Sequence, residues 1–285
     1  EEVPQELADA VAKADEEVFS NVRAMLGLDK LEACNVGAAP TPPEVLEFFH
    51  AIGIPIAEVW GMSELSCVAT AMPRDRVKIG TVGTALPGVE LRLAEDGEVL
   101  VRGPLVMRGY RNKPEQTRET IDADGWLATG DIGELDGDGY LRIIDRKKEL
   151  IISAGGKNMS PANIEARIKT SSPLIGQACV IGDGRAYNVA LLVLDPDGAM
   201  AFSKQRGLDL PLAKLVEHDV IRSEIDRAVA AANEHLSRVE QIKRYQLLPD
   251  EWLPGGDELT PTMKLKRKPI AAKYATQIDA LYAHA

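Results

Sequence analysis

The sequence predicts an α/β segment followed by a small β-barrel and then by an α+β region. Three patterns support this order. Residues 41–59 combine a helical pattern with a buried strand, short alternating strands separated by turn signals begin near residue 80, and helical periodicity dominates residues 212–236. The chain has 285 residues, of which 45% are hydrophobic and 27% charged, so it can bury a core and lacks the composition of a disordered protein.

The first segment, residues 1–80, has the pattern of helices packed on a short sheet. Residues 41–44 (Thr-Pro-Pro-Glu) resemble a capping box with proline at the first helical position, and Gly53 ends the helix that follows. Residues 54–59 form a buried strand that leads directly into residues 60–64, WGMSE. Open α/β sheets place their ligands at such strand ends. An apolar helical face precedes these elements, formed by Leu7, Val11, Ala14, Val18, Val22 and Met25.

Residues 81–145 carry the pattern of a β-barrel or bent sheet. Apolar and polar residues alternate on both sides of a hairpin signal at Asp96-Gly97. A second turn signal, DGDG at residues 136–139, precedes a strand over residues 140–144. This acidic turn does not fit an EF-hand calcium loop, because Leu141 and Lys147 stand where that loop needs glycine and glutamate.

Residues 146–285 predict an α+β domain that follows a charged stretch at residues 145–149. Ser160-Pro161 begins a helix and residues 189–194 read as a strand. One long amphipathic helix is predicted through Leu212, Leu215, Ile221, Ile225, Val229 and Leu236. The paired glycines in SAGGK, residues 153–157, lack P-loop spacing, although they let a backbone or slender ligand pass close by.

Composition narrows the classes of partner. Acidic residues outnumber basic ones 44 to 33, for a net charge of -11, which argues against nucleic acid as the main partner. No apolar run approaches the roughly 18 residues of a membrane span, and Glu1-Glu2 resembles no signal peptide. The missing initiator methionine suggests a processed or cut chain. Cys34, Cys67 and Cys179 read as buried apolar residues of a cytoplasmic protein.

Three motifs could carry chemistry, and each has a simpler interpretation. Ser63 and Glu64 suit a phosphate oxygen and Mg²⁺, but they also suit an ordinary helix N-terminus capped by Ser63. Asp131, in WLATGD, suits ribose hydroxyls, or a turn bonded to its own backbone. Lys264, in the basic tail, suits delivery of a charge to an anion, or a solvated charge run. The histidines His50, His218, His235 and His284 show no ligand spacing.

The order of the motifs is more informative than any one of them. Gly37-Ala38-Ala39-Pro40, WGMSE, WLATGD at 126–131, DRKKELIISAGGK at 145–157 and LTPTMKLKRK at 259–268 together resemble the adenylate-forming superfamily. Within it, the chain is most similar to bacterial long-chain fatty acyl-CoA synthetases of the bubblegum-like type. Trp60 and Ser63 stand where tyrosine and threonine are more usual, which keeps an aromatic plane and a hydroxyl.

The resemblance implies a fold and a division into domains. Residues 1–80 would end the large α/β adenylation domain, residues 81–145 would be its β-barrel subdomain, and residues 146–285 the mobile α+β C-terminal domain. The N-terminal part of the fold would be missing. Nothing in the sequence corresponds to the family's triphosphate loop, and an exposed apolar face is expected on residues 1–80.

The resemblance also implies roles for individual residues. Gly37, Ala38, Ala39 and Pro40 would line the adenine and acyl side of the pocket, and Trp60, Gly61 and Met62 would flank adenine. Ser63 would contact phosphate, Glu64 would hold Mg²⁺, and Asp131 and Arg146 would bind the ribose. Lys148 would be the hinge, Gly155 and Gly156 would flank the pantetheine tunnel, and Lys264 would contact the substrate carboxylate and the α-phosphate.

The implied activity is AMP-forming ligation of a long-chain fatty acid to CoA, with ATP, Mg²⁺ and CoA required. Fatty acid, ATP and CoA would be the partners, together with the missing N-terminal half as a partner segment. Peripheral membrane contact stays open. Two alternatives are a non-catalytic truncated paralogue or fragment that binds nucleotide or acyl-adenylate, and an adenylating enzyme whose acceptor is a carrier protein.

Overall fold

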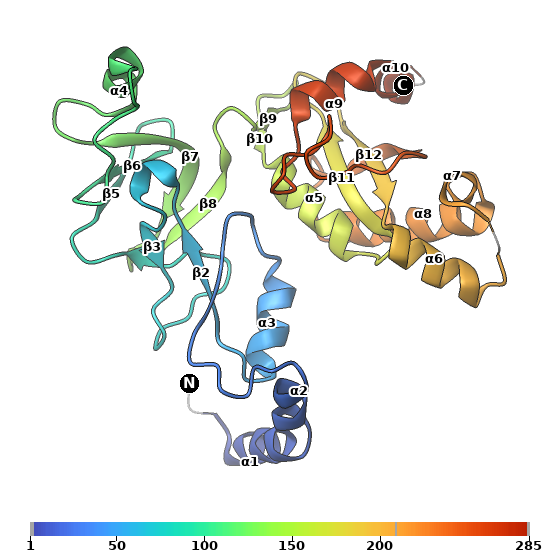
Figure 1. Ribbon diagram of the computed structural model, residues 1–285, viewed down its shortest axis with the longest axis horizontal. Helices are drawn as coiled ribbons and strands as arrows, with labels where there is room; N and C mark the ends of the chain where they lie inside the picture. The colour runs from blue at the N-terminus through green and yellow to red at the C-terminus, as the bar shows by residue number, and fades with distance from the viewer. Residues whose placement is uncertain (1–2, 209, 284–285) are drawn as a thin grey trace. The chain divides into compact units, whose positions relative to one another are not determined.

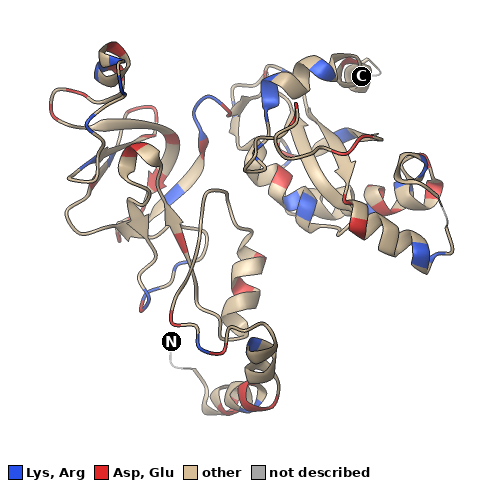
Figure 2. Cartoon of the chain, viewed as in Figure 1, with Lys and Arg blue, Asp and Glu red and all other residues tan. Residues whose placement is uncertain are grey.

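The computed structural model describes residues 3–208 and 210–283. The expectations placed on Glu1, Glu2 and His284 lie outside these residues. The chain divides into two compact units, Glu1–Lys147 and Lys148–Ala285. Figure 1 shows both units and labels their elements, and Figure 2 shows acidic and basic residues distributed over both. No helix within the described ranges is long and apolar enough to cross a membrane.

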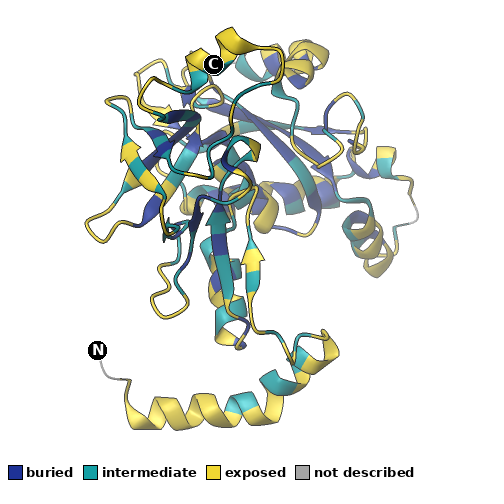
Figure 3. Ribbon diagram, turned by 60° about the vertical axis from the view of Figure 1, so that its left-hand side comes forward, coloured by how far each residue is buried: buried dark blue, intermediate teal, exposed yellow. Residues whose placement is uncertain are grey.

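The first unit begins with a helical segment that is mostly exposed. Helix α1 (Gln5–Ala14) continues into a π-helical turn, η1 (Asp15–Phe19), and then into α2 (Ser20–Met25). Its predicted apolar face forms but is not covered, since Leu7, Val11 and Met25 are 55%, 53% and 88% exposed. Figure 3 shows this segment largely in the colour of exposed residues. The exposed apolar face expected on residues 1–80 is therefore confirmed.

A four-stranded sheet follows, with strand order β1-β2-β3-β4. Strands β1 (Cys34–Val36) and β2 (Ile56–Trp60) are parallel and are connected by α3 (Pro43–Ala51). Two short strands, β3 (Thr70–Ala71) and β4 (Thr84–Ala85), add in antiparallel fashion. A single 3-10 turn, η2 (Ser63–Leu65), follows β2.

The predicted capping box at residues 41–44 is wrong by one residue. The N-cap of α3 is Pro42, the helix begins at Pro43, and no side chain caps it. A residue that precedes proline is disfavoured in the helical region, so Pro42 stays extended, with ψ of 134°, and Thr41 lies outside the helix. Gly53 follows the C-cap Ile52 with φ of +77°, which confirms the predicted end of the helix.

The second sheet is an antiparallel meander with strand order β5-β6-β7-β8. Its strands are β5 (Glu90–Leu93), β6 (Glu98–Arg102), β7 (Leu127–Leu135) and β8 (Leu141–Arg146), and α4 (Pro114–Thr120) lies between β6 and β7. Both predicted hairpins are present. Val99, Val101, Leu127 and Leu141 form its core together with Trp60 and Leu65.

The second unit is built on a three-stranded sheet with strand order β11-β12-β13. A hairpin of β9 (Ile151–Ile152) and β10 (Asn158–Met159) precedes α5 (Pro161–Thr170), which Ser160 caps as predicted. The sheet strands are β11 (Ile175–Ile181), β12 (Asn188–Leu194) and β13 (Ile242–Leu248). The remaining helices are α6 (Pro196–Gln205), α7 (Leu212–Leu215), α8 (Asp219–Glu234), α9 (Arg267–Lys273) and α10 (Ala275–Tyr282).

The central strand β12 is buried along its whole length because both faces of the sheet are covered. Alternate residues point to opposite faces of a strand. Ala190, Leu192 and Leu194 join the core that contains α5 and α8, whereas Leu191 and Val193 join a second core with α9 and α10.

The single long helix predicted over residues 212–236 is wrong. The chain forms α7 and α8 with a break between them. His218 occupies the N-cap of α8, where its Nδ1 accepts a hydrogen bond from the amide of Val220 at 3.3 Å. Apolar periodicity continues across the break because Leu215, Ile221 and Ile225 all enter the same core, so the pattern alone could not reveal it.

Candidate functional site

Trp60, Asp131 and Arg146 form a cluster in the first unit. Trp60 ends β2, Asp131 lies within β7, and Arg146 ends β8 as the cross-strand partner of Asp131. The indole Nε1 of Trp60 donates to Asp131 Oδ2 at 2.9 Å, and Arg146 Nε lies 3.4 Å from Asp131 Oδ1. The structure thus brings together three predicted residues that are far apart in sequence.

The two members of the Asp131–Arg146 pair differ in exposure. The side chain of Asp131 is 8% exposed and that of Arg146 is 56% exposed. A buried carboxylate held from two sides keeps a fixed orientation, while the exposed guanidinium keeps donors available to a ligand. The interpretation of Asp131 as a turn residue is wrong, because it lies on a strand and bonds to Trp60.

The backbone around Asp131 is shaped by Gly130, which has φ of +73°. Its amide donates to Glu98 Oε1 at 2.8 Å, and its carbonyl accepts from the amide of Lys147 at 2.8 Å. A side chain added at Gly130 would meet no atom within 4 Å, so the left-handed φ is what favours glycine there.

The GAAP turn, residues 37–40, lies beside the end of β2. It follows β1 directly, and parallel strands β1 and β2 end at the same edge of the sheet. A Cβ at Gly37 would come within 2.7 Å of the Val59 carbonyl oxygen, so glycine permits this approach. All four residues, Gly37, Ala38, Ala39 and Pro40, are exposed. The turn and residues 60–64 therefore border one edge, as the sequence predicts for a ligand site.

Glu64 lies in η2 and is tied to a residue that the sequence did not indicate. The Tyr110 hydroxyl donates to Glu64 Oε1 at 2.9 Å, and the amide of Met107 donates to the Glu64 carbonyl at 2.8 Å. Burial and the neighbouring Glu64 carboxylate raise the pKa of Tyr110. Tyr110 also lines a hollow of about 450 Å³ formed by Arg108, Gly109, Tyr110, Asn112, Lys113, Pro114, Thr117 and Arg118.

Ser63 is exposed at the start of η2. Met62 is the N-cap of this turn and no side chain caps it, so the interpretation of Ser63 as a helix cap is wrong. The loop folds back so closely that a Cβ at Gly61 would come within 2.0 Å of the Cys67 carbonyl oxygen. Gly61 is thus required by the backbone itself, whatever binds nearby.

The link between the units carries several charges. Lys147 contacts Asp96 and Glu98, at 2.5 and 2.8 Å, and these carboxylates raise its pKa. Lys148 is the first residue of the second unit and is exposed. Glu149 accepts from Arg267 Nε at 3.4 Å. The residues on both sides of Lys148, namely Lys147 and Glu149, are therefore each held by charged contacts within their own unit.

Gly155 and Gly156 lie in the exposed loop of the β9–β10 hairpin. Gly156 has φ of +78°, and a Cβ added there would meet no atom within 4 Å. The amide of Ala154 donates to the Arg185 carbonyl at 3.2 Å, which fixes one side of the loop. The paired glycines thus leave open space on the surface of the second unit.

Lys264 projects from a closed turn before α9. Its carbonyl accepts from the amide of Thr260 at 2.8 Å, and its own amide donates to Thr260 Oγ1 at 3.0 Å. Met263, which directly precedes Lys264, has φ of +64°. The side chain of Lys264 is exposed, so the backbone of this part of the basic tail is an ordered turn and the charge of Lys264 is solvated.

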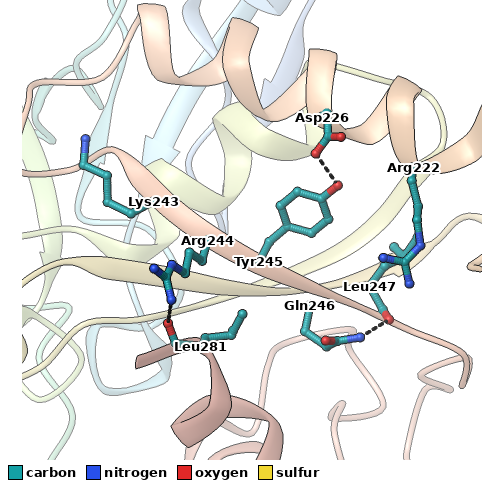
Figure 4. Close-up of a pocket in the computed structure, with 8 residues that line it drawn as sticks. All are labelled: Arg222, Asp226, Lys243, Arg244, Tyr245, Gln246, Leu247 and Leu281. Carbon is teal, nitrogen blue, oxygen red and sulfur yellow. Dashed lines mark hydrogen bonds between the residues drawn. The ribbon is translucent and has the colours of Figure 1, made fainter. Parts of the chain in front are cut away.

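A second hollow, of about 370 Å³, contains none of the predicted site residues (Figure 4). It is lined by Arg222, Asp226, Lys243, Arg244, Tyr245, Gln246, Leu247 and Leu281. Tyr245 donates to Asp226 Oδ1 at 2.7 Å, and burial together with this carboxylate raises the pKa of Tyr245. Arg244 Nη1 donates to the Leu281 carbonyl at 3.3 Å. These contacts hold the hollow's walls in place.

Two of the three cysteines depart from the predicted burial. Cys179 is buried, Cys34 is half-buried, and Cys67 is exposed. Cys67 lies in the loop that folds back over Gly61 and has φ of +92°. No group of three or more His, Cys, Asp or Glu side chains suited to a metal ion occurs among the residues described.

Sequence comparison identifies the family to which a chain with this fold and this cluster belongs. The profile described as "AMP-binding enzyme" matches residues 3–111, and that described as "AMP-binding enzyme C-terminal domain" matches residues 148–285. The chain belongs to this family. Its similarity is to members named as fatty-acid–CoA ligases, including the bubblegum-like branch, which confirms the family and the fold class predicted from the sequence.

Three relatives illustrate the similarity. The Mycobacterium tuberculosis protein fadD11, named as a fatty-acid–CoA ligase, is 58% identical over 99% of this chain and 50% of its own length. Mycobacterium bovis FadD15, a long-chain-fatty-acid–CoA ligase, is 41% identical over 94% and 44%. Xenopus laevis ACSBG2, of the same named class, is 35% identical over 94% and 40%. The chain thus spans about half the length of the curated relatives it matches.

Solved structures share the fold. The A-PCP didomain of carboxylic acid reductase from Segniliparus rugosus, in complex with AMP, superposes with a TM-score of 0.69 at 23% identity, covering 95% of this chain and 37% of that one. ATP-bound MatB from Rhodopseudomonas palustris gives a TM-score of 0.60 at 27% identity, covering 85% and 45%.

Proposed function

We propose that this chain serves AMP-forming ligation of a long-chain fatty acid to CoA. The observation that carries the proposal is the Trp60–Asp131–Arg146 cluster, in which an aromatic ring, a buried carboxylate and an exposed guanidinium meet at the edge bordered by the GAAP turn. A carboxylate beside a guanidinium suits a nucleoside, since the carboxylate accepts from ribose hydroxyls, and the buried Trp60 ring holds that carboxylate in place.

In this proposal the nucleotide lies along the cluster. Gly37, Ala38, Ala39 and Pro40 border adenine and the acyl group, while Trp60, Gly61 and Met62 flank adenine. Asp131 and Arg146 bind the ribose, and the exposed hydroxyl of Ser63 contacts phosphate. Tyr110 joins these residues as the group that orients Glu64.

Glu64 would hold Mg²⁺. A single partly exposed carboxylate fits this ion, which is usually bound by one or two carboxylates together with substrate phosphates and water. When bound, Mg²⁺ would supply positive charge to the phosphate oxygens. Tyr110 fixes one Glu64 oxygen by its 2.9 Å hydrogen bond.

Two half-reactions follow from this assignment. A fatty-acid carboxylate attacks the α-phosphorus of ATP and an oxygen–phosphorus bond forms. The bond from the α-phosphorus to the bridging oxygen breaks, and pyrophosphate leaves with its electron pair. The charge of Lys264 offsets the repulsion between the two anions. The CoA thiolate then attacks the acyl carbon, a carbon–sulfur bond forms, and AMP leaves.

The second unit would supply different groups to each step. Lys264 would serve the first, and Gly155 and Gly156 would border the pantetheine path in the second. Lys148 would be the hinge about which the unit turns between steps, consistent with the division of the chain at that residue. A cytoplasmic location accords with these substrates and with the fewness of cysteines.

ATP–pyrophosphate exchange with a panel of fatty acids tests the proposal. Because nothing in this sequence corresponds to the family's triphosphate loop, we expect little exchange from the chain alone. Once a segment that supplies this loop is joined to it, we expect exchange that depends on a long-chain acid and is abolished by chelation of Mg²⁺. Equilibrium binding of AMP measured alongside separates the remaining outcomes. Exchange followed by transfer to a carrier protein, but not to CoA, would replace the acceptor, and AMP binding without exchange in the presence of every acid would reduce the chain to a nucleotide-binding fragment.

A further inference from the structure

Arg267 forms a nearly buried ion pair three residues after Lys264. It is the first residue of α9, and its side chain is 22% exposed. Its Nη1 and Nη2 atoms donate to Glu165 Oε1 and Oε2 at 2.6 and 2.8 Å, and the Glu165 side chain is 7% exposed. This two-point geometry fixes the direction of the guanidinium as well as its distance.

Glu165 joins three elements at one carboxylate. It lies on α5, pairs with Arg267 on α9, and accepts the amide of Val180 from β11 at 2.8 Å. The start of α9 is thereby fastened to the framework of the second unit. Any tilt of α9 would cost charge-assisted hydrogen bonds in a place that water scarcely reaches.

The turn that carries Lys264 lies between the Arg267–Glu165 pair and a second set of contacts, made by Lys266. The amide of Lys266 donates to the Glu258 carbonyl at 2.7 Å, and Lys266 Nζ donates to the Gly256 carbonyl at 2.7 Å. On the far side, Arg267 makes charged contacts with Glu165 and Glu149 at the start of α9. Arg267 therefore fixes one end of the turn from which Lys264 projects, next to the Leu259–Leu265 bridge that closes the turn.

Arg267 has a third contact that bears on the link between the units. Its Nε lies 3.4 Å from Glu149 Oε2, and Glu149 is the residue after Lys148. The Glu149 side chain is 44% exposed, so this contact is weaker than the pair with Glu165. One guanidinium thus touches the segment next to the expected hinge and the base of the Lys264 turn.

We propose that Arg267 is a positioning residue for Lys264. It holds the Lys264 turn at a constant place on the second unit and in fixed relation to the residue after Lys148. This inference rests on the proposed role of Lys264. The rival explanation is that the ion pair stabilises the second unit and does nothing specific for the reaction.

Arg267→Lys separates these explanations, because it keeps the positive charge and removes the two parallel hydrogen bonds that the guanidinium donates to Glu165. We expect the turnover of ATP–pyrophosphate exchange to fall by about 10²-fold at unchanged KM for ATP, the loss typical of a displaced catalytic group. Thioester formation from supplied acyl-AMP should stay within about twofold. Arg227→Lys is the matched control, since Arg227 pairs with Glu224 at 2.5 Å on an exposed face of α8.

Hydrogen exchange supplies a measurement that needs no turnover. In Arg267→Lys, the amides of Thr260, Met263, Lys264 and Lys266, all hydrogen-bonded in the turn, should exchange at least about tenfold faster. Amides of β12 should keep their rates. Equal acceleration in the turn and in β12 would mean general destabilisation and would overturn the proposal, as would unchanged rates in the turn.

Lys264→Ala, measured in parallel, distinguishes two kinds of failure. If Lys264→Ala leaves ATP–pyrophosphate exchange intact, the proposed function of Lys264 is wrong, whatever the effect of changing Arg267. If Lys264→Ala abolishes ATP–pyrophosphate exchange while Arg267→Lys leaves it unchanged, only the positioning role of Arg267 is wrong. Glu149→Gln should lower the rate of ATP–pyrophosphate exchange by less than Arg267→Lys does. A larger effect would contradict the inference that the Arg267–Glu149 contact is weaker than the Arg267–Glu165 pair.

Discussion

Asp131 illustrates how one residue can be structural and functional at once. Its carboxylate holds the Trp60 indole and lies beside Arg146, so it fixes both neighbours before any ligand arrives. A preorganised site of this kind binds without first ordering its side chains, which lowers the entropic cost of association. The same carboxylate is then available to the ribose hydroxyls in the proposed complex.

Asp131→Asn should weaken AMP binding by about tenfold. The amide keeps the size of the carboxylate, but a charged acceptor contributes roughly 1.5–3 kcal/mol per hydrogen bond and a neutral one less. Titration calorimetry with AMP measures the change, and Asp124→Asn, at an exposed position, is the control. Equal affinity in both variants would exclude Asp131 from the nucleotide site.

The cysteines allow a simple test of burial. We expect iodoacetamide to label Cys67 rapidly and Cys179 only after unfolding. Cys179 is enclosed by the core of the second unit, and burial, followed by the charge of Glu165, raises its pKa to about 12, whereas Cys67 is exposed. Mass spectrometry of the labelled peptides gives the order of reaction, and early labelling of Cys179 would show that α9 opens readily.

At the scale of elements, the predicted hairpins and the predicted strand at residues 189–194 matched the structure more closely than the helix boundaries, whereas β11 and β13 were not predicted. Alternation at residues 89–101 and the DGDG turn have local causes, so the pattern suffices to place them. The start of α3 depended on Pro42 preceding Pro43, and the break before α8 depended on His218, neither of which disturbs apolar periodicity.

His218→Ala should lower the free energy of unfolding of the second unit by about 1 kcal/mol, because the first turn of α8 loses its side-chain acceptor. His218→Asn should restore most of the loss, since asparagine is a favoured N-cap residue. Urea unfolding followed by circular dichroism compares the three proteins. If alanine and asparagine destabilise equally, the cap contributes nothing and packing of His218 is what matters.

Some residues of the candidate site could be predicted from the order of the motifs, and others could be found only from contacts in the folded chain. The motif order located Asp131, Arg146 and Glu64, whose roles remain predictions. Tyr110 could not be found, because its partner Glu64 is 46 residues away and no local pattern relates them. The Arg267–Glu165 pair, 102 residues apart, was hidden for the same reason.

The whole molecule is organised around the division at Lys148. Trp60, Glu64, Asp131 and Arg146 belong to the first unit, and Lys264, Gly155 and Gly156 to the second. A reaction in two steps can use this arrangement if the first unit keeps the nucleotide while the second presents different groups in turn. The half-reactions should therefore respond separately to changes in the second unit.

Lys264→Ala should reduce adenylation by about 10²-fold or more and leave thioester formation from supplied acyl-AMP within about twofold, because the charge is needed only while two anions approach. Pyrophosphate release and CoA-thioester formation, measured separately, give the two rates. Lys268→Ala, in the same basic stretch and also exposed, is the control. An equal loss in both steps would rule out a role confined to adenylation.

The two-faced strand β12 also has a consequence for how the chain is made. Its partner β13 begins at Ile242, and the helices that cover its second face begin at Arg267. On the ribosome, β12 is made before these segments, and its apolar side chains stay uncovered until the segments follow. Assembly of the second unit is thus a late event in synthesis, and the interval before it is when chaperones would be needed most.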